Sequence, residues 1–322
     1  METLVTGGAG FIGSHLVEEL LQKGRKVVVL DDLSTGKREN LPDSEKLEFI
    51  EGSITDRELL RELFSKYKFK SVFHLAAIPS VDLSVKEPLK THSVNCDGTL
   101  YLLEESKRVG VERFIFASSA AVYGNRPELP KREDHPVEPL TPYGVDKYSS
   151  ERFVVNSYSL YGLKTTALRF FNVYGERQDP HSPYAGVISI FIDRFIRFQR
   201  GEDVKIEIFG NGKQTRDFIY VKDVVASLLT CESSEVFLGK VINVGTGKEV
   251  SLLELIDILR KITGVFPPIV FRPKRKGDIE RSYADVTNLA RCGYIPKFSL
   301  FEGLKRTYIW ELDRRNASLE FK

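Results

Sequence analysis

The stretch Thr3-Leu-Val-Thr-Gly-Gly-Ala-Gly-Phe-Ile-Gly-Ser14 decides the fold of this chain. A short apolar run leads into Gly7, Gly10 and Gly13, and apolar residues at helical spacing follow, so the predicted order is strand, glycine turn, helix. The first glycine allows a tight turn, the second lets a pyrophosphate approach the backbone, and the third lets the helix pack closely on the strand. The free N–H groups and the dipole of the helix start favour phosphate, so the stretch predicts a dinucleotide site.

A second apolar run, Val27–Leu30, ends in Asp31 and Asp32. Asp31 lies roughly 20 residues beyond the glycine turn, where a carboxylate binds the ribose hydroxyls of an adenosine and selects NAD over NADP. The alternative interpretation of Asp31 is an ordinary turn residue at the end of a strand.

Apolar strand patterns alternate with helical patterns along the first half of the chain. Further strands are predicted near 47–50, 71–77, 113–117, 165–171 and 241–245, and helices near 57–67, 92–108, 145–161, 187–200 and 251–263. This alternation predicts an α/β fold, a Rossmann-type doubly wound parallel sheet whose ligands lie at the carboxyl ends of the strands. Gly7, Asp31, Ala76 and Ser119 all follow or end such strands.

The alternating pattern breaks after Tyr174, where glycine and proline mark an irregular segment. We therefore predict an NAD-binding domain over 1–172, with later contributions near 217–247. Residues 173–216 and 248–322 are expected to form a smaller α/β lobe that binds the substrate.

Composition excludes several classes of protein. The chain has 322 residues and a net charge of +2 with both signs mixed, so we expect no nucleic-acid partner. No apolar run reaches the ~18 residues of a membrane span, and a strand pattern at the N-terminus argues against a signal peptide. The scattered Cys96, Cys231 and Cys292 predict neither a disulfide framework nor a metal site, so we expect a cytoplasmic protein.

Ser119, Tyr143 and Lys147 are the predicted catalytic residues. Tyr143 and Lys147 are four residues apart, so they share one face of a helix, and Ser119 ends a predicted strand. A nearby ammonium and a positive nicotinamide ring would lower the pKa of the tyrosine from its usual ~10 and make it a usable base. The alternative is that a Tyr-x-x-x-Lys spacing and a serine at a strand end arise by chance.

Seven motifs in order along the chain carry a family resemblance. They are Thr6–Gly13, His74–Ala77, Ser118–Gly124, Tyr143–Lys147, Arg169–Gly175, Thr215–Val221 and Arg275–Asp278. On these motifs the chain resembles the extended short-chain dehydrogenase/reductase superfamily and, within it, the nucleotide-sugar 4-epimerases of the UDP-glucose 4-epimerase type.

The resemblance implies a set of binding residues. NAD would contact Gly7, Gly10, Phe11, Ile12, Gly13, Asp31, Asp32, Leu33, Ser34, Thr35, Gly36, Ser53, Ile54, Leu75, Ala76, Ala77, Asn95, Tyr143, Lys147 and Phe171. A UDP-sugar would contact Ser119, Tyr143, Asn172, Val187, Ile208, Arg216, Arg275, Asp278 and Ser282, with the two arginines on the diphosphate and Asp278 on the uridine ribose. Ser53 departs from the family, which usually has an aspartate there to meet the adenine.

The implied reaction is epimerisation at C4 of a UDP-hexose through a transient 4-keto sugar, with NAD retained. A 4,6-dehydratase would carry Asp-Glu where this chain has Ala120 and Ala121, and Arg177-Gln-Asp-Pro180 departs from the Arg-Pro-Asp usual in uronate epimerases. A serine at 282 leaves room for an N-acetyl group, so UDP-GlcNAc and UDP-GalNAc are expected substrates beside UDP-glucose and UDP-galactose.

Three alternatives remain open at this point. They are a UDP-glucuronate 4-epimerase, another nucleotide-sugar-modifying member of the family, and a non-catalytic NAD-binding protein on the same fold. In the family the helices near 92–108 and 145–161 pair with their copies, so the resemblance also implies a homodimer.

Overall fold

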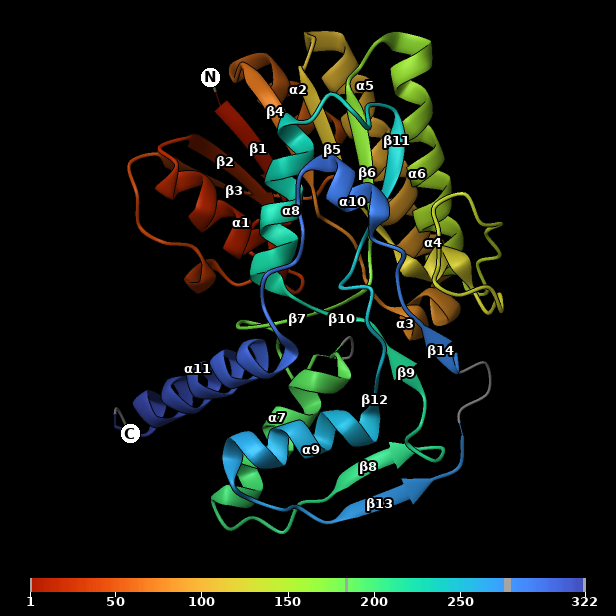
Figure 1. Ribbon diagram of the computed structural model, residues 1–322. Helices are drawn as coiled ribbons and strands as arrows, with labels where there is room; N and C mark the ends of the chain where they lie inside the picture. Colours follow the sequence, from red (N-terminus) through yellow and green to blue (C-terminus); the bar gives the residue numbers. More distant parts are fainter. Residues whose placement is uncertain (1, 183–184, 275–278, 321–322) are drawn as a thin grey trace.

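The structure is a computed structural model that describes residues 2–182, 185–274 and 279–320. Figure 1 shows a larger upper lobe built around one sheet and a smaller lower lobe in which α7, α9 and α11 lie beside short strands. The chain crosses between the lobes several times, through β7, β10 and the segments before β12 and after β14.

The upper lobe contains the predicted parallel sheet. Its order is β11-β6-β5-β4-β1-β2-β3, and every neighbouring pair is parallel. The strands are β1 (Glu2–Thr6), β2 (Lys26–Asp31), β3 (Leu47–Glu51), β4 (Phe69–His74), β5 (Arg113–Ser119), β6 (Thr165–Phe170) and β11 (Lys240–Val244). The order reverses between β1 and β4, the switch point at which such sheets bind dinucleotides. The predicted fold class is confirmed.

Helices cover both faces of this sheet and bury its apolar runs. One face packs on α1 (Phe11–Gln22) and α8 (Val221–Ser233), and the other on α2 (Arg57–Lys66), α5 (Gly98–Val109) and α6 (Pro142–Tyr161). Shorter elements are η1 (Arg38–Asn40), α3 (Val81–Lys86), α4 (Pro88–His92), the π-helical η2 (Ser93–Asp97) and η3 (Ala120–Tyr123).

Local signals set where α6 begins and ends. The Thr141 hydroxyl accepts from the backbone N–H of Gly144, and Pro142 occupies the first helical position, where a missing N–H costs nothing. The helix ends at Gly162, whose φ of 72° is the left-handed cap conformation that glycine adopts readily. The predicted helix near 145–161 therefore starts one turn earlier, and that first turn carries Tyr143.

The smaller lobe has a core of its own between helices and short strands. The strands form the pairs β10-β7 and β13-β8 and the three-stranded sheet β12-β9-β14. Its elements are β7 (Asn172–Tyr174), α7 (Val187–Gln199), β8 (Ile206–Phe209), β9 (Thr215–Arg216), β10 (Phe218–Tyr220), β12 (Val250–Ser251), α9 (Leu252–Thr263), β13 (Ile269–Arg272), β14 (Arg281–Ser282) and α11 (Leu300–Glu320). A capping box starts α9: the Ser251 side chain accepts from the backbone N–H of Glu254, and the Glu254 carboxylate accepts from the backbone N–H of Ser251.

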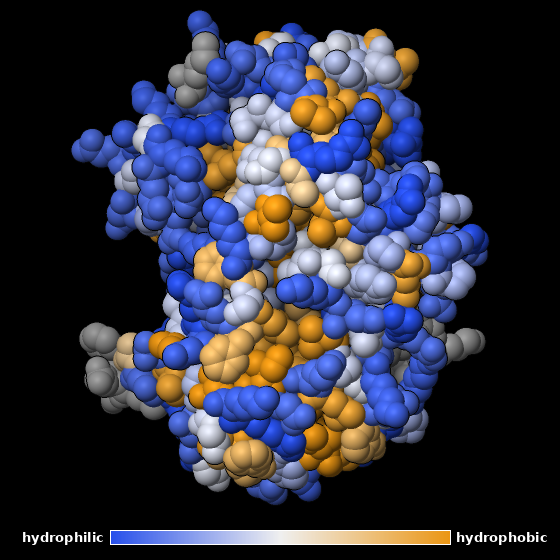
Figure 2. Space-filling model, viewed as in Figure 1, coloured by the Kyte–Doolittle hydropathy of each residue, from blue (hydrophilic) through white to orange (hydrophobic). Residues whose placement is uncertain are grey.

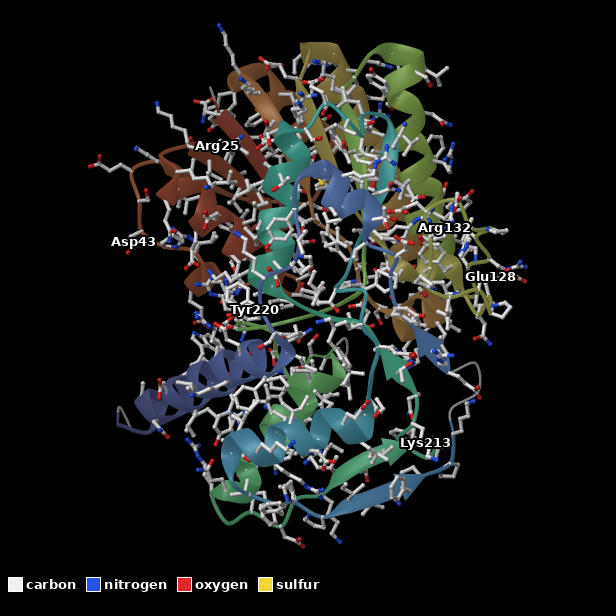
Figure 3. All side chains as sticks on the ribbon, viewed as in Figure 1. Arg25, Asp43, Glu128, Arg132, Lys213 and Tyr220 are labelled. Atoms are coloured by element: carbon white, nitrogen blue, oxygen red, sulfur yellow. The ribbon has the colours of Figure 1, made fainter. Side chains whose placement is uncertain are left out.

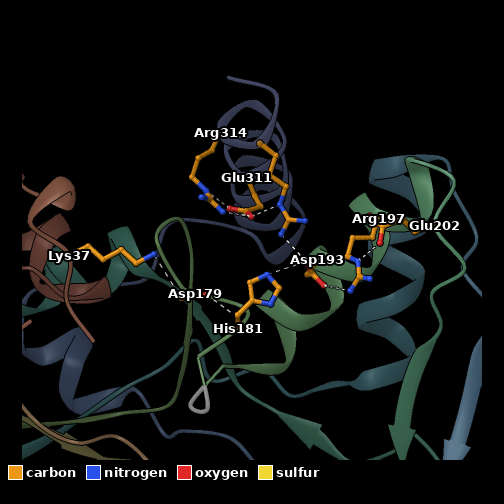
Figure 4. Close-up of polar contacts among 9 residues, drawn as sticks. Lys37, Asp179, His181, Asp193, Arg197, Glu202, Glu311 and Arg314 are labelled. Carbon is orange, nitrogen blue, oxygen red and sulfur yellow. Dashed lines mark hydrogen bonds and ion pairs between the residues drawn. The ribbon is translucent and has the colours of Figure 1, made fainter. Parts of the chain in front are cut away.

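A charge network joins α11 to α7 (Figure 4). Asp193 on α7 is buried and accepts a 2.8 Å hydrogen bond from Arg315, which also donates to Glu311 one turn back on α11. In the same view Lys37, just after the predicted ribose loop, lies 3.6 Å from Asp179. The Lys37–Asp179 pair is partly exposed and stabilises little, but it connects the upper lobe to the segment after β7 beside the expected cofactor site.

One short helix corrects the predicted division of the chain. The segment after β14 returns to the upper lobe, where α10 (Thr287–Cys292) packs on α8 and β11, and Leu289 joins the core beneath the sheet. The smaller lobe predicted over 248–322 therefore excludes this segment. The reason is the apolar face of α10, which the edge strand β11 needs as a cover.

Surface character differs between the lobes. On the face viewed in Figure 2, hydrophilic residues dominate the upper lobe, whereas apolar residues gather over the region of α7 and α9. Figure 3 places Tyr220 at the junction of the lobes, and Arg132 and Glu128 in the loop at one side of the upper lobe. No helix among the described residues is long and apolar enough to cross a membrane.

Candidate active site

The glycine stretch forms a close-fitting turn between β1 and α1. Gly7 has a φ of 70°, and a Cβ there would lie 2.7 Å from the backbone nitrogen of Ala76. A Cβ on Gly13 would lie 2.1 Å from the carbonyl oxygen of Gly7, so only glycine lets the helix approach the strand this closely. Gly10 is the N-cap of α1 and has no side chain to occupy the first-turn N–H groups of Phe11 and Ile12. These features fit a dinucleotide pyrophosphate.

Asp31 lies at the end of β2 and organises the next loop. Its carboxylate accepts 2.9 Å hydrogen bonds from the backbone N–H groups of Ala9 and Leu33, which ties the glycine turn to the predicted ribose loop. A Cβ on Gly36 would lie 2.7 Å from the same carboxylate, and Leu33 adopts a φ of 56°. Burial raises the pKa of Asp31 although these N–H groups lower it. A carboxylate has further lone pairs, so ribose hydroxyls fit here.

The rest of the ribose loop is exposed. Asp32 accepts from both the backbone N–H and the hydroxyl of Ser34, at 3.0 Å and 2.6 Å, and Thr35 lies beside it in solvent. The loop is therefore preformed around its two aspartates.

The predicted adenine and nicotinamide contacts lie at the ends of β3 and β4. The Ser53 hydroxyl lies 2.8 Å from that of Thr55, and Ile54 is buried. Leu75, Ala76 and Ala77 follow β4 and are partly exposed.

Asn95 has a different position from the one expected of a cofactor contact. Its side chain is 1% exposed, accepts a 2.8 Å hydrogen bond from the N–H of Ile78 and donates to the carbonyl of Ile78 at 3.1 Å. Both amide atoms therefore hold the loop that follows Ala77. Through this loop Asn95 can shape the cofactor site without touching the ligand.

The three predicted catalytic residues are brought together at the carboxyl end of β5. Ser119 ends that strand, and Tyr143 and Lys147 lie one turn apart on α6, which packs against β5. Ser119 is close enough to Tyr143 to lower the pKa of the phenol, and the hydroxyl of Ser119 accepts from the N–H of Ala121 at 3.1 Å. Lys147 is buried and donates a 2.8 Å hydrogen bond from Nζ to the carbonyl of Ala117.

The pKa values of this cluster correct one expectation. Burial raises the pKa of Tyr143, and the hydrogen bond from Ser119 only partly opposes it. Lys147 was expected to lower that pKa, but its ammonium faces the carbonyl of Ala117 instead. Burial lowers the pKa of Lys147 itself to about 8, while the neighbouring Asp146 raises it. The protein alone therefore does not make Tyr143 a strong base, and the positive nicotinamide would have to supply that effect.

The predicted substrate contacts lie where the two lobes meet. Arg216 and Ser282 are register partners in the parallel pair β9–β14, so the residue expected to hold the diphosphate and the one expected to set the sugar pocket are direct neighbours. Arg216 Nη1 donates to the carbonyls of Thr215 and Ile279 at 2.8 Å and 2.7 Å.

The remaining substrate residues differ in exposure. Asn172 is exposed at the start of β7, and Val187 begins α7 and is half-buried. Phe171, which was predicted to contact the cofactor, is buried against Tyr123. Ile208 is 1% exposed in the core of the smaller lobe, so its side chain is not available for the predicted contact. The backbone pattern of β8 requires this, since alternate residues of a strand face the core. Arg275 and Asp278 lie outside the described residues.

Two groups of buried polar residues were not predicted from the sequence. The Asp217 carboxylate accepts from the backbone N–H groups of Thr246, Gly247 and Ala284 at 2.8, 2.9 and 3.1 Å, and so holds the segments on either side of Arg216 and Ser282. Glu151 on α6 binds Ser118 and Arg169. Asp217, Ser118 and Arg169 lie within motifs that resemble the family, whereas Glu151 lies outside all seven of them.

Comparison with known proteins agrees with this geometry. The model of the NAD dependent epimerase/dehydratase family matches residues 3–245. The putative UDP-glucose 4-epimerase of Methanocaldococcus jannaschii is 41% identical over 308 residues, which are 95% of this chain and 97% of that protein.

Two solved structures share the whole fold. UDP-glucose 4-epimerase from Thermotoga maritima, crystallised with UDP-glucose, superposes with a TM-score of 0.91 at 43% identity and covers 98% of this chain and 100% of its own. UDP-N-acetylglucosamine 4-epimerase from Methanobrevibacter ruminantium M1, in complex with UDP-N-acetylmuramic acid, superposes with a TM-score of 0.91 at 38% identity and covers 97% and 98%.

Proposed function

Because the chain belongs to the NAD dependent epimerase/dehydratase family, we propose that it is an isomerase that interconverts UDP-hexoses differing at C4, as UDP-glucose and UDP-galactose do. The observation that carries the proposal is the cluster of Ser119, Tyr143 and Lys147 beside the glycine turn. UDP-glucose 4-epimerases at 41% and 43% identity over nearly the whole chain support the same reaction.

The residues that would hold NAD are those of the glycine turn and the Asp31 loop. The first-turn N–H groups of α1 would bind the pyrophosphate, and the Asp31 carboxylate the adenosine ribose. When bound, NAD supplies the hydride chemistry, by which C4 of the sugar passes through a ketone and is reduced again on its opposite face. The protein supplies binding, orientation and proton transfer.

Proton transfer falls to Tyr143. Its Oη would accept the proton of the sugar 4-hydroxyl and return it when the hydroxyl is re-formed. Ser119, which lies beside Tyr143, would hold the same sugar oxygen. Lys147, one turn from Tyr143 on the same helix, is held by its hydrogen bond to the carbonyl of Ala117 and would contact the cofactor. Arg216 would hold the diphosphate as the anchor about which the sugar turns.

Product analysis by NMR tests this function. The purified protein should convert UDP-glucose into UDP-galactose without added cofactor, because the reaction has no net redox change. Tyr143→Phe should lower turnover by about 10²- to 10⁴-fold and leave bound NAD in place. An unchanged rate in Tyr143→Phe would instead favour a non-catalytic NAD-binding protein.

We extend the proposal to N-acetylated sugars. Ser282 is small, half-buried and next to Arg216, which is compatible with a wide sugar pocket. The Methanobrevibacter ruminantium enzyme, named for UDP-N-acetylglucosamine, supports this breadth. Ser282→Tyr should remove turnover of UDP-GlcNAc and retain that of UDP-glucose within about threefold, since it fills only the space of the N-acetyl group. Equal losses on both substrates would contradict the pocket argument.

Neutral sugars are favoured over uronates by the position of Arg177. Its guanidinium donates to the hydroxyl of Ser14 at 3.1 Å and pairs with Glu18 on α1. Its charge is therefore compensated within the protein. Incubation with UDP-glucuronate in the same NMR assay should give no 4-epimer, and its conversion would restore the uronate alternative.

We also propose that the protein is a homodimer in the cytoplasm. Exposed apolar side chains on α6, among them Val145, Phe153 and Leu160, support a partner on that face. Near its start a surface pocket of about 490 Å³ is lined by Leu89 and Leu140, which are also exposed. Three cysteines without a disulfide suit a reducing compartment.

A further inference from the structure

The end of β5 and the catalytic face of α6 are joined by ordered polar contacts. The carbonyl of Ala117 accepts from Lys147 Nζ at 2.8 Å, and two residues later Ser119 lies beside Tyr143. These contacts set the distance between helix and strand at the reacting groups. They do not explain Ser118, the residue between them.

Ser118 faces a third residue of the same helix face, Glu151. Glu151 lies four residues beyond Lys147, so it continues the row of catalytic side chains by one turn. The Ser118 hydroxyl donates to Glu151 Oε2 at 2.6 Å. Arg169 donates to both oxygens of the same carboxylate, from Nε at 2.9 Å and from Nη2 at 2.7 Å.

The two donors are themselves neighbours in the sheet. Ser118 on β5 and Arg169 on β6 are direct register partners, so one carboxylate of α6 bridges two adjacent strands. Glu151 and Arg169 are 0% and 3% exposed, which removes both charges from water. The guanidinium is further held over the ring of Tyr123, 4.7 Å from its centroid.

This arrangement is better suited to positioning than to stability. Desolvation of two charges offsets most of their attraction, and apolar replacements of buried ion pairs are often as stable. A two-pronged guanidinium–carboxylate contact is directional, however, so it resists both sliding and rotation of the helix. Either movement would displace Tyr143 and Lys147, because these residues lie on the same helix face as Glu151.

We propose that Glu151, held by Ser118 and Arg169, is a positioning residue that fixes the register of α6 against β5 and thereby the places of Tyr143 Oη and Lys147 Nζ. The inference rests on the proposed epimerase function. A misplacement of about 1 Å at reacting groups can cost about 100-fold in rate. Loss of the contacts between Glu151, Ser118 and Arg169 should therefore lower kcat more than it raises KM.

Ser118→Ala is the main test, because it leaves the buried ion pair intact. We expect kcat on UDP-glucose to fall about 10-fold, KM to stay within about threefold and NAD to remain bound. Glu151→Gln should lower kcat about 100-fold if it folds. A crystal structure of Ser118→Ala should show Lys147 Nζ displaced from the carbonyl of Ala117.

Thr165→Val is the matched control. Thr165 is buried on β6, and its hydroxyl donates at 2.8 Å to the carbonyl of Val154 in the far half of α6. This variant also loses one strand–helix hydrogen bond, so its melting temperature should fall, but kcat should stay within about twofold of the wild type because the lost bond lies away from the catalytic end.

Two kinetic outcomes would overturn the inference. They are an unchanged kcat in Ser118→Ala, and a loss of kcat equal to that of Thr165→Val. An undisplaced Lys147 in the variant structure would do the same without reference to activity. If the wild type turns over no UDP-hexose, the proposed function fails, and the structural comparison alone decides the positioning role.

Discussion

At the scale of single residues, two buried histidines are held neutral. The ring of His74 lies between the hydroxyls of Thr6 and Thr99, at 2.8 Å and 2.9 Å, and burial lowers its pKa to about 3 with help from the charge of Lys147. His15 contacts the carbonyl of Glu176 at 3.0 Å, and burial lowers its pKa to about 4. Neither ring can take up a proton in the folded protein near pH 6.

Acid should therefore destabilise the fold through these two residues. An unfolded histidine has a pKa of about 6.5, so below that pH the unfolded state binds protons that the native state does not bind. The stabilisation is complete above pH 6.5 and is lost as the pH falls toward 4 for His15 and 3 for His74. At pH 5 each residue should lower the free energy of unfolding by about 2 kcal/mol.

Urea denaturation at pH 7.5 and pH 5.0 measures this effect. His74→Gln should show a smaller difference between the two pH values than the wild type, whatever its own stability at pH 7.5. An equal difference in both proteins would mean that His74 is not kept neutral by the fold.

At the scale of elements, the turn between β1 and α1 uses glycine for two purposes, close packing of the helix on the strand at Gly13 and access of the phosphate at Gly10. A Cβ on Gly13 would clash with the carbonyl of Gly7, whereas one on Gly10 would lie 3.2 Å from that oxygen and otherwise face the phosphate position. Gly13→Ala should therefore lower both the melting temperature and the NAD content. Gly10→Ala should lower the NAD content with a much smaller change in melting temperature.

Calorimetry and the absorbance of released NAD provide the two readouts. The pair serves as its own control, because both variants add a single methyl group to the same turn. Equal thermal stability in the two variants would show that helix–strand packing does not depend on Gly13.

Most elements could be predicted because their signals are local. The apolar runs of the seven sheet strands and the glycine turn after β1 each act over a few residues. The π-helical η2 was not predicted, because its apolar pattern resembles that of the α5 helix it precedes. The apolar patterns of a π-helix and an α-helix do not differ over one turn, so only tertiary packing decides which of the two forms.

At the scale of the whole molecule, the proposed homodimer would depend on the exposed apolar face of α6. Phe153 is 44% exposed in the middle of that helix, and Glu at this place would put a charge into an apolar interface. Light scattering should give the mass of a dimer for the wild type and of a monomer for Phe153→Glu. Val236→Glu, an exposed apolar residue outside α6, should leave the dimer unchanged. A monomeric wild type would refute the proposal.

The sequence by itself determined the strands of the sheet, the glycine turn and the shared helix face of Tyr143 and Lys147, because each of these signals is local. Tertiary structure alone decided the return of α10 to the upper lobe and the burial of Ile208. It also brought Cys231 within 3.5 Å of Cys292 between their sulfur atoms, although 60 positions of chain separate them and no pattern links them.

The site divides in the same way. Tyr143 and Lys147 were predictable from a helical interval, whereas the bridge from Glu151 to Ser118 and Arg169 joins three elements. The direction of the Tyr143 pKa shift also needed the structure, because it depends on burial and on where Lys147 points. The spacing of residues along the chain predicts which side chains share a helix or strand face. Which of these side chains contact residues on other elements depends on how the elements pack.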